Sequence, residues 1–228
     1  MNQAAERDRT SGALQAAFAV SWINTTQEIL EAETYFPAVE KSQLPITPVQ
    51  ITLGGPDSQW KAMQQLYFFM IMTAEKKVQI QSPFFIPDES LLEAIKAAAL
   101  SGVEVEIMCS KHGTAIELAH RASFTYLADV ARSGAKVYMY NKGYFHCKTI
   151  NIDSEVCAIG TANFDIRSFS INYEAMAVLY DSEKARELAS DFENDLKSCE
   201  LFTWEEYQTY PFWRRLLNSI TRLASPML

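Results

Sequence analysis

The chain has 228 residues, of which 48% are hydrophobic and 21% are charged. This mixture is typical of a globular protein and excludes a disordered or fibrous chain. The formal net charge of −8 argues against a dedicated nucleic-acid-binding protein, because neutralising phosphates requires a basic surface. The longest apolar run, residues 66–72, is far shorter than the ~18 residues of a membrane span, and the polar residues 1–10 do not resemble a signal peptide. We therefore expect a soluble or membrane-surface protein.

The four cysteines form no C-x-x-C pair and show no spacing typical of zinc ligands. Two of them, Cys109 and Cys157, end or interrupt apolar runs, where a free cysteine behaves as a small hydrophobic residue. We expect reduced, buried thiols rather than disulfides.

The N-terminal part of the chain predicts one long helix followed by an irregular segment. Residues 1–36 carry apolar side chains near helical spacing, and residues 37–48 contain three prolines and little periodicity. A short strand at residues 49–53 follows and ends at a Gly-Gly-Pro-Asp turn.

From residue 58 onward the predicted helices and strands alternate. Asp88 is expected to cap one helix, and Gly102 and Gly134 to end two of them. The predicted helices cover residues 58–73, 88–100, 115–132 and 182–197. The predicted strands cover residues 77–81, 103–108, 136–140, 145–152, 156–159 and 172–180. This order predicts an α/β fold with a mixed sheet flanked by helices on both faces.

The C-terminal stretch differs from the rest of the chain in charge. Residues 211–228 contain three arginines and no acid, whereas the preceding 210 residues hold 17 basic and 28 acidic residues, a charge of −11. One helical face would carry Phe212, Trp213, Leu216, Leu217, Ile220 and Leu223. Two interpretations are open: an interfacial helix on anionic lipid, or an ordinary amphipathic helix packed on the domain.

The strongest chemical signal is an H-x-K-x4-D pattern formed by His146, Lys148 and Asp153. In a strand over residues 145–152, His146 and Lys148 would share one face and Cys147 would point the other way, into the core. An imidazole beside an ammonium suits a phosphoryl site, because the imidazole can attack phosphorus or carry a proton while the lysine binds a phosphoryl oxygen. Asp153, at the end of the strand, is expected to accept hydrogen bonds that brace the loop.

The residues downstream extend this pattern. A turn of small residues runs from Gly160 through Thr161 to Asn163, where backbone N–H groups and an amide side chain can face a phosphate. Glu174 then lies in a strand, where a carboxylate could orient the imidazole of His146 through its second nitrogen. The alternative for His146 is a hydrogen-bonded histidine of an ordinary strand, which these downstream residues disfavour.

These motifs resemble those of the phospholipase D superfamily, in which H-x-K-x4-D is followed by a small-residue turn ending in Asn. The spacings agree, since Asn163 and Glu174 follow His146 by 17 and 28 residues. More narrowly, the chain resembles the second catalytic half of bacterial cardiolipin synthases. The segments that carry this resemblance are residues 54–58, 81–91, 160–169 and 223–228.

The resemblance implies a site built from two such motifs, which together convert two phosphatidylglycerol molecules into cardiolipin and glycerol through a phosphohistidine. It implies that His146 is the general acid and base, that Lys148, Asn163 and Thr161 bind the phosphate, and that Glu174 is the partner of the imidazole. Asp153 completes the motif. No metal and no other cofactor are implied, because the lysines and asparagines neutralise the phosphate.

The chain departs from the family in holding the motif once, because neither His112 nor His120 has a lysine two residues later. We therefore expect three parts: residues 1–48 as a helix and linker left from a first half, 49–200 as the catalytic domain, and 201–228 as an amphipathic tail.

Two hypotheses follow for the partner. The chain acts either as a half-enzyme that docks on a first half, or as a phosphodiesterase in which a second copy supplies the other motif. The remaining partners that the resemblance implies are phosphatidylglycerol and anionic membrane lipid, with no nucleic acid. The implied location is the cytoplasmic side of the cell membrane, with this chain bound peripherally.

Overall fold

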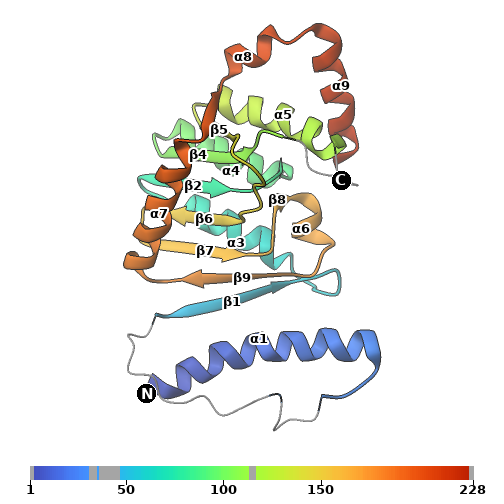
Figure 1. The fold of residues 1–228 in the computed structure, drawn as a ribbon, viewed down its shortest axis with the longest axis vertical. Helices are drawn as coiled ribbons and strands as arrows, with labels where there is room; N and C mark the ends of the chain where they lie inside the picture. Colours follow the sequence, from blue (N-terminus) through green and yellow to red (C-terminus); the bar gives the residue numbers. More distant parts are fainter. Residues whose placement is uncertain (1–2, 31–34, 36–46, 113–116, 226–228) are drawn as a thin grey trace.

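The computed structural model describes residues 3–30, 35, 47–112 and 117–225. Eight strands form one mixed sheet in the order β1-β9-β7-β6-β2-β4-β5-β10 (Figure 1). These strands are β1 (Val49–Gly54), β2 (Lys77–Gln81), β4 (Glu104–Ser110), β5 (Lys136–Tyr140), β6 (Thr149–Ile152), β7 (Val156–Gly160), β9 (Glu174–Leu179) and β10 (Cys199–Phe202). Strands β2, β4 and β5 are parallel, and the other pairings are antiparallel.

A second, two-stranded sheet pairs β3 (Phe85–Ile86) with β8 (Phe164–Asp165). The described helices are α1 (Gln3–Thr26), α3 (Ala62–Met72), α4 (Glu89–Leu100), α5 (Glu117–Arg132), α6 (Ile166–Ser170), α7 (Ser182–Leu196), α8 (Trp204–Thr209) and α9 (Phe212–Leu223). In Figure 1, α7 crosses one face of the sheet and α3 and α4 lie behind the other. The predicted mixed sheet with helices on both faces is confirmed.

The core has two parts because both faces of the sheet are covered. The larger part lies between the sheet and α3, α4 and α5, and includes Tyr67, Ile80 and Ile107. A smaller cluster under α7 includes Phe145 and Phe192. Such two-sided burial is usual for the parallel strands of an α/β sheet.

Local signals in the sequence locate several helix ends correctly. The Asp88 carboxylate accepts a hydrogen bond from the Leu91 N–H at 3.0 Å and caps α4. Gly102 and Gly134, which follow α4 and α5, have φ angles of 97° and 101°, a left-handed conformation that glycine adopts without strain.

The prediction for residues 145–152 is wrong in its first half. Strand β6 begins at Thr149, so residues 145–148 are not part of the ladder and the alternation of a strand does not apply to them. As a consequence Cys147 is exposed rather than turned into the core. All four cysteines are free; Cys109 and Cys157 are buried.

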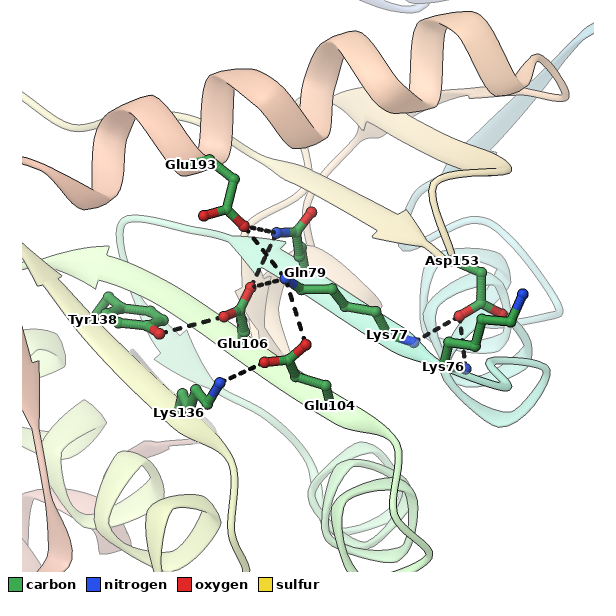
Figure 2. Close-up of polar contacts among 9 residues, drawn as sticks. All are labelled: Lys76, Lys77, Gln79, Glu104, Glu106, Lys136, Tyr138, Asp153 and Glu193. Atoms are coloured by element: carbon green, nitrogen blue, oxygen red, sulfur yellow. Dashed lines mark hydrogen bonds and ion pairs between the residues drawn. The ribbon is translucent and has the colours of Figure 1, made fainter.

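A polar network crosses the sheet at the beginning of the parallel strands (Figure 2). The buried carboxylate of Glu106 receives the Lys77 ammonium at 2.9 Å, the Gln79 amide at 3.0 Å and the Tyr138 hydroxyl at 3.3 Å. Glu193 of α7 also contacts Lys77, at 3.3 Å. Because these residues come from β2, β4, β5 and α7, the network ties the helix to three neighbouring strands.

Within the described parts of the chain, no helix combines the length and the apolarity needed to cross a bilayer.

Candidate active site

The candidate site lies at the ends of three central strands of the sheet, where β2 and β7 end and β6 begins. Thr149, the first residue of β6, pairs with Gln81 at the end of β2 and with Ile159 near the end of β7. Its hydroxyl donates to the side-chain oxygen of Gln81 at 3.0 Å. Lys148 immediately precedes this anchored residue, and its carbonyl accepts the Gly160 N–H at 3.2 Å. The ladder therefore holds the backbone of Lys148 in place.

The two basic groups of the motif have different surroundings. Lys148 is buried, with 9% of its surface exposed, and its Nζ donates to the carbonyl oxygen of His146 at 3.0 Å. His146 is exposed, and its ring stacks on Tyr144 with 5.3 Å between ring centroids. Thus the lysine is part of the packed domain, whereas the imidazole is presented at the surface.

Both groups have pKa values below their ordinary ranges. Burial lowers the pKa of Lys148, and the negative charge of Glu174 partly opposes this shift. Partial burial lowers the pKa of His146, and the charge of Lys148 lowers it further. Each shift favours the uncharged form, and in the imidazole that form can accept a proton.

The turn after β7 depends on Gly160. A Cβ atom at this position would collide with the carbonyl oxygen of Ala175 and would lie 2.8 Å from the Cα of Met176. Only glycine allows this close approach of the two strands. The turn is then closed by a hydrogen bond from the Thr161 N–H to the Ala175 carbonyl at 3.0 Å.

Glu174 opens β9 next to this turn. Its carboxylate accepts hydrogen bonds from the Thr161 hydroxyl and, at 3.2 Å, from the Asn172 amide, rather than from His146. The structure thus brings Glu174 to Thr161 and into electrostatic range of Lys148. It does not bond the carboxylate to the imidazole.

Asn163 is half-buried at the far end of the turn. Its backbone N–H donates to the Ser168 hydroxyl at 3.2 Å. Its side chain hydrogen-bonds Asp165, and its Oδ1 is buried without a hydrogen-bond partner. Burial raises the pKa of Asp165, although hydrogen bonds from Ser168 and Asn163 oppose the shift. The amide is therefore held beside a partly desolvated carboxylate.

Two residues of this region were not singled out by sequence reasoning. Tyr67 is buried on α3, and its hydroxyl donates to the Ala162 carbonyl at 3.0 Å, beneath the turn. Burial, and after it the charges of Glu174 and Asp165, raise the pKa of Tyr67 above its ordinary value. A tyrosine inside an apolar run is the signal for such a contact, because a buried hydroxyl needs a partner. Tyr144, which stacks on His146, has no comparable signal in the sequence.

Asp153 lies at the other end of β6, roughly 17 Å from Lys148 for five residues of extended chain. Its carboxylate accepts the backbone N–H groups of Glu75, Lys76 and Lys77 at 2.9, 2.8 and 2.6 Å, as Figure 2 shows for the two lysines. Burial opposes ionisation, but these hydrogen bonds outweigh it and lower the pKa of Asp153. Asp153 therefore braces the loop, and it is not brought to the other site residues.

His146 is exposed at the surface. Of three cavities of about 630, 600 and 860 Å³, none is lined by His146 or Lys148, but Glu174 lines the third. Among the described residues, no group of three or more His, Cys, Asp or Glu side chains could hold a metal ion.

Comparison with solved structures defines the class of fold. Nuc from Salmonella typhimurium, a phospholipase D family member, matches with a TM-score of 0.61 and 20% identity, over 69% of this chain and 99% of that one. Phosphatidylserine synthase from Haemophilus influenzae Rd KW20 matches with a TM-score of 0.65 and 17% identity, over 82% of this chain and 49% of that one. The fold is that of the phospholipase D family.

The sequence comparisons narrow this class. The model of the family described as "Cardiolipin synthase, PLD-like domain" matches residues 67–196, and the chain belongs to that family. The major cardiolipin synthase ClsA of Bacillus subtilis is 40% identical over 219 residues, which are 95% of this chain and 45% of that protein. A cardiolipin synthase of Geobacillus kaustophilus is 38% identical over 94% of this chain and 43% of its own length. The chain thus spans about half the length of the curated relatives it matches.

Proposed function

We propose that this chain supplies one half-site of a cardiolipin synthase-type phosphatidyl transfer, in which two phosphatidylglycerol molecules give cardiolipin and glycerol. The observation that carries the proposal is the exposed His146 beside the buried Lys148 just before β6, in a chain that holds the motif once. The 40% and 38% identity with two cardiolipin synthases supports this class of reaction.

In the first step, a histidine of the other half attacks phosphorus, and the P–N bond forms as the P–O bond to glycerol breaks. Protonated His146 gives its proton to the leaving glycerol oxygen. In the second step, neutral His146 takes the hydroxyl proton of another phosphatidylglycerol, whose oxygen displaces the histidine from phosphorus. Lys148 and Asn163 stabilise the charge on the phosphoryl oxygens. Thr161 would join them only after its hydroxyl releases Glu174, because its hydroxyl proton and its N–H are both donated within the turn.

Glu174 has a different role in this proposal from the one that the family resemblance implies. Since its carboxylate bonds Thr161 and Asn172, it would have to leave these partners to reach the imidazole. Its negative charge counteracts the burial of Lys148 and so favours the ammonium form that binds phosphate. Asp153 supports the fold of the loop and does not touch the substrate.

The same proposal assigns the parts of the chain and its location. Residues 1–48 would close a first half, 49–200 would form the catalytic domain and 201–228 would form the tail. The domain would act peripherally at the cytoplasmic side of the cell membrane, on anionic lipid.

A second candidate is a phosphodiesterase that is active as a homodimer, with both motifs supplied by copies of this chain. It is favoured by the Nuc comparison, because this chain covers 99% of the Nuc chain, which therefore holds one unit of this fold.

The test combines oligomeric state with turnover. The chain, alone or with a separately produced first half of a cardiolipin synthase, is incubated with phosphatidylglycerol, and cardiolipin is measured by mass spectrometry. A monomer that is inactive alone and active with the first half supports the half-site; a dimer active alone supports the second candidate. His146→Ala must abolish the activity of both the mixture with the first half and the homodimer. Activity that remains in this variant would show that His146 takes no part in the mechanism. A covalent phosphate trapped on His146 would show that His146 is the nucleophile and that the histidine of the other half is the general acid and base.

A further inference from the structure

The C-terminal helix α9 packs on the domain with its polar side. It lies against α5, and its buried positions are Asn218 and Thr221, 2% and 4% exposed, followed just beyond the helix by Ser225 at 1%. This is the reverse of an ordinary amphipathic helix of a globular protein, which buries its apolar stripe.

The apolar side of α9 is largely exposed, and two of its residues, Trp213 and Leu217, also line a cavity of about 600 Å³ beside α5 and β10. Its six large hydrophobic side chains are between 38% and 82% exposed. They are Phe212, Trp213, Leu216, Leu217, Ile220 and Leu223. At about 100° per residue they cover roughly 140° of the helix surface, opposite the buried polar positions. We call these six residues the α9 apolar face.

Specific contacts hold the helix in this orientation. Arg222 donates to the Asp129 carboxylate of α5 at 2.6 Å and lies over the Tyr126 ring at 4.1 Å. At the other end, Arg214 lies over the Tyr210 ring at 3.9 Å. Rotating α9 to bury its apolar face would break these ion-pair and cation–π contacts.

We propose that the α9 apolar face inserts into the surface of a bilayer that contains anionic lipid. A helix with one apolar face and arginines on the other side suits the interface between headgroups and acyl chains, where the aromatic rings of Phe212 and Trp213 are also favoured. The choice of lipid over a protein partner rests in part on the proposed function, whose substrate is a lipid.

Charge supports an anionic surface and this particular orientation. Residues 211–228 carry three arginines and no acid, whereas the rest of the chain has a net charge of −11. An anionic membrane would attract this segment and repel the rest of the domain. In Figure 1, α9 lies at the upper right of the view, and β2 and β7 point to the right.

The experiment measures vesicle binding in the His146→Ala background, so that catalysis does not change the lipid. Vesicles contain either phosphatidylcholine alone or phosphatidylcholine with phosphatidylglycerol. Leu216→Glu/Ile220→Glu places two charges on the α9 apolar face, at positions already 47% and 54% exposed. The matched control is Leu100→Glu at the end of α4, where the side chain is 74% exposed.

We expect binding to the vesicles with phosphatidylglycerol, about tenfold or more weaker binding by the double variant, and no loss in the control. Circular dichroism checks that the variants fold. Equal binding by the double variant, or no vesicle binding by the parent chain, would overturn the proposal. So would a double variant that loses self-association or association with the first half while keeping vesicle binding. Turnover of detergent-dispersed phosphatidylglycerol is measured with the chain that retains His146, mixed with the first half. Turnover without vesicle binding would contradict this inference alone, and vesicle binding without turnover would contradict the proposed function alone.

Discussion

Lys148 and His146 are two residues apart, and their environments suit them to different functions, charge stabilisation for the lysine and proton transfer for the histidine. The lysine is packed against the sheet and its Nζ is held by the carbonyl oxygen of His146 at 3.0 Å. The imidazole is accessible, with Tyr144 stacked on it. A fixed cation beside an accessible imidazole provides charge stabilisation and proton transfer at one phosphate, without requiring either side chain to move far.

Lys148→Met is expected to raise the pKa of His146, because the lysine charge is one of the two causes that lower it, after burial. The measurement is a proton NMR titration, with the His146 resonance assigned from its loss in His146→Ala. In the assembled enzyme the same variant should lower kcat about 10²- to 10³-fold. Lys142→Met, which removes an exposed lysine nearby, is the control. An unchanged His146 midpoint would contradict the proximity of the two charges.

Gly160→Ala should destabilise the fold, because the added Cβ would meet the Ala175 carbonyl and the backbone of Met176. We expect a loss of about 2 kcal/mol or more in the free energy of unfolding, measured by urea denaturation. Gly12→Ala in α1, where no atom lies within 4 Å of the new Cβ, should change stability by less than about 1 kcal/mol. Equal effects of the two substitutions would argue against the close strand approach.

At the scale of elements, the turn between β6 and β7 is held by hydrogen bonds from the segment that leads into β2. Asp153 and Ser154 have φ angles of 55° and 56°, which suits a tight hairpin between antiparallel strands. Three backbone N–H groups from the segment that enters β2 then bond the Asp153 carboxylate. One side chain thus joins the hairpin to the central strand.

Asp153→Asn tests this joint, because asparagine tolerates the left-handed backbone but offers one acceptor oxygen instead of two. We expect a loss of about 1–3 kcal/mol at pH 7 in thermal or urea unfolding. The folded-state pKa of Asp153 is lowered, so its contribution is present above the unfolded value of about 3.9 and is lost as pH falls through the folded value. The gap between the two proteins should therefore narrow below about pH 4. A gap independent of pH would contradict a role for the carboxylate charge.

The network around Glu106 is a second joint between elements (Figure 2). Burial of Lys77 opposes its charge, but the hydrogen bond and charge of Glu106 outweigh this and raise the pKa of Lys77. Glu106→Ala would leave Lys77, Gln79 and Tyr138 without this partner, and we expect a loss of about 2 kcal/mol in the free energy of unfolding. Glu193→Ala, which removes a carboxylate that is 54% exposed, should cost less than about 1 kcal/mol. A larger loss of stability for Glu193→Ala than for Glu106→Ala would contradict the central position of Glu106 in the network.

At the scale of the whole molecule, α1 is set apart from the sheet. A cavity of about 860 Å³ lies between α1, the end of β1 and the start of β9. Phe18 and Val20 of this helix are 55% and 56% exposed. By contrast, the chain from Thr47 onward is tied to the sheet, since the Thr47 hydroxyl donates to Asp181 at 2.8 Å.

A chain that begins at Thr47 is therefore expected to fold. Its Tm should lie within about 4 °C of the parent value, because little packing against the sheet is lost. Circular dichroism would show the melting curve together with a lower helical signal. A shortened chain that no longer unfolds cooperatively would show that α1 belongs to the folding unit.

By itself, the sequence determined relations between residues close along the chain. The cap at Asp88 and the glycine after α4 follow from backbone geometry that a short segment already has. The family resemblance extended this to Asn163 and Glu174. The alternation of elements also predicted the mixed sheet, because each amphipathic element must bury its apolar side against a neighbour.

Which distant surfaces meet depends on the folded molecule as a whole. Tyr67 lies 95 residues from its hydrogen-bond partner Ala162, and β6 begins at Thr149 because Gln81 and Ile159 are there to pair with it. The orientation of α9 has the same origin: its pattern allows either side to face the domain, and contacts with Asp129 and Tyr126 select the polar one. Such choices depend on the competition among all available partners, which no local pattern contains.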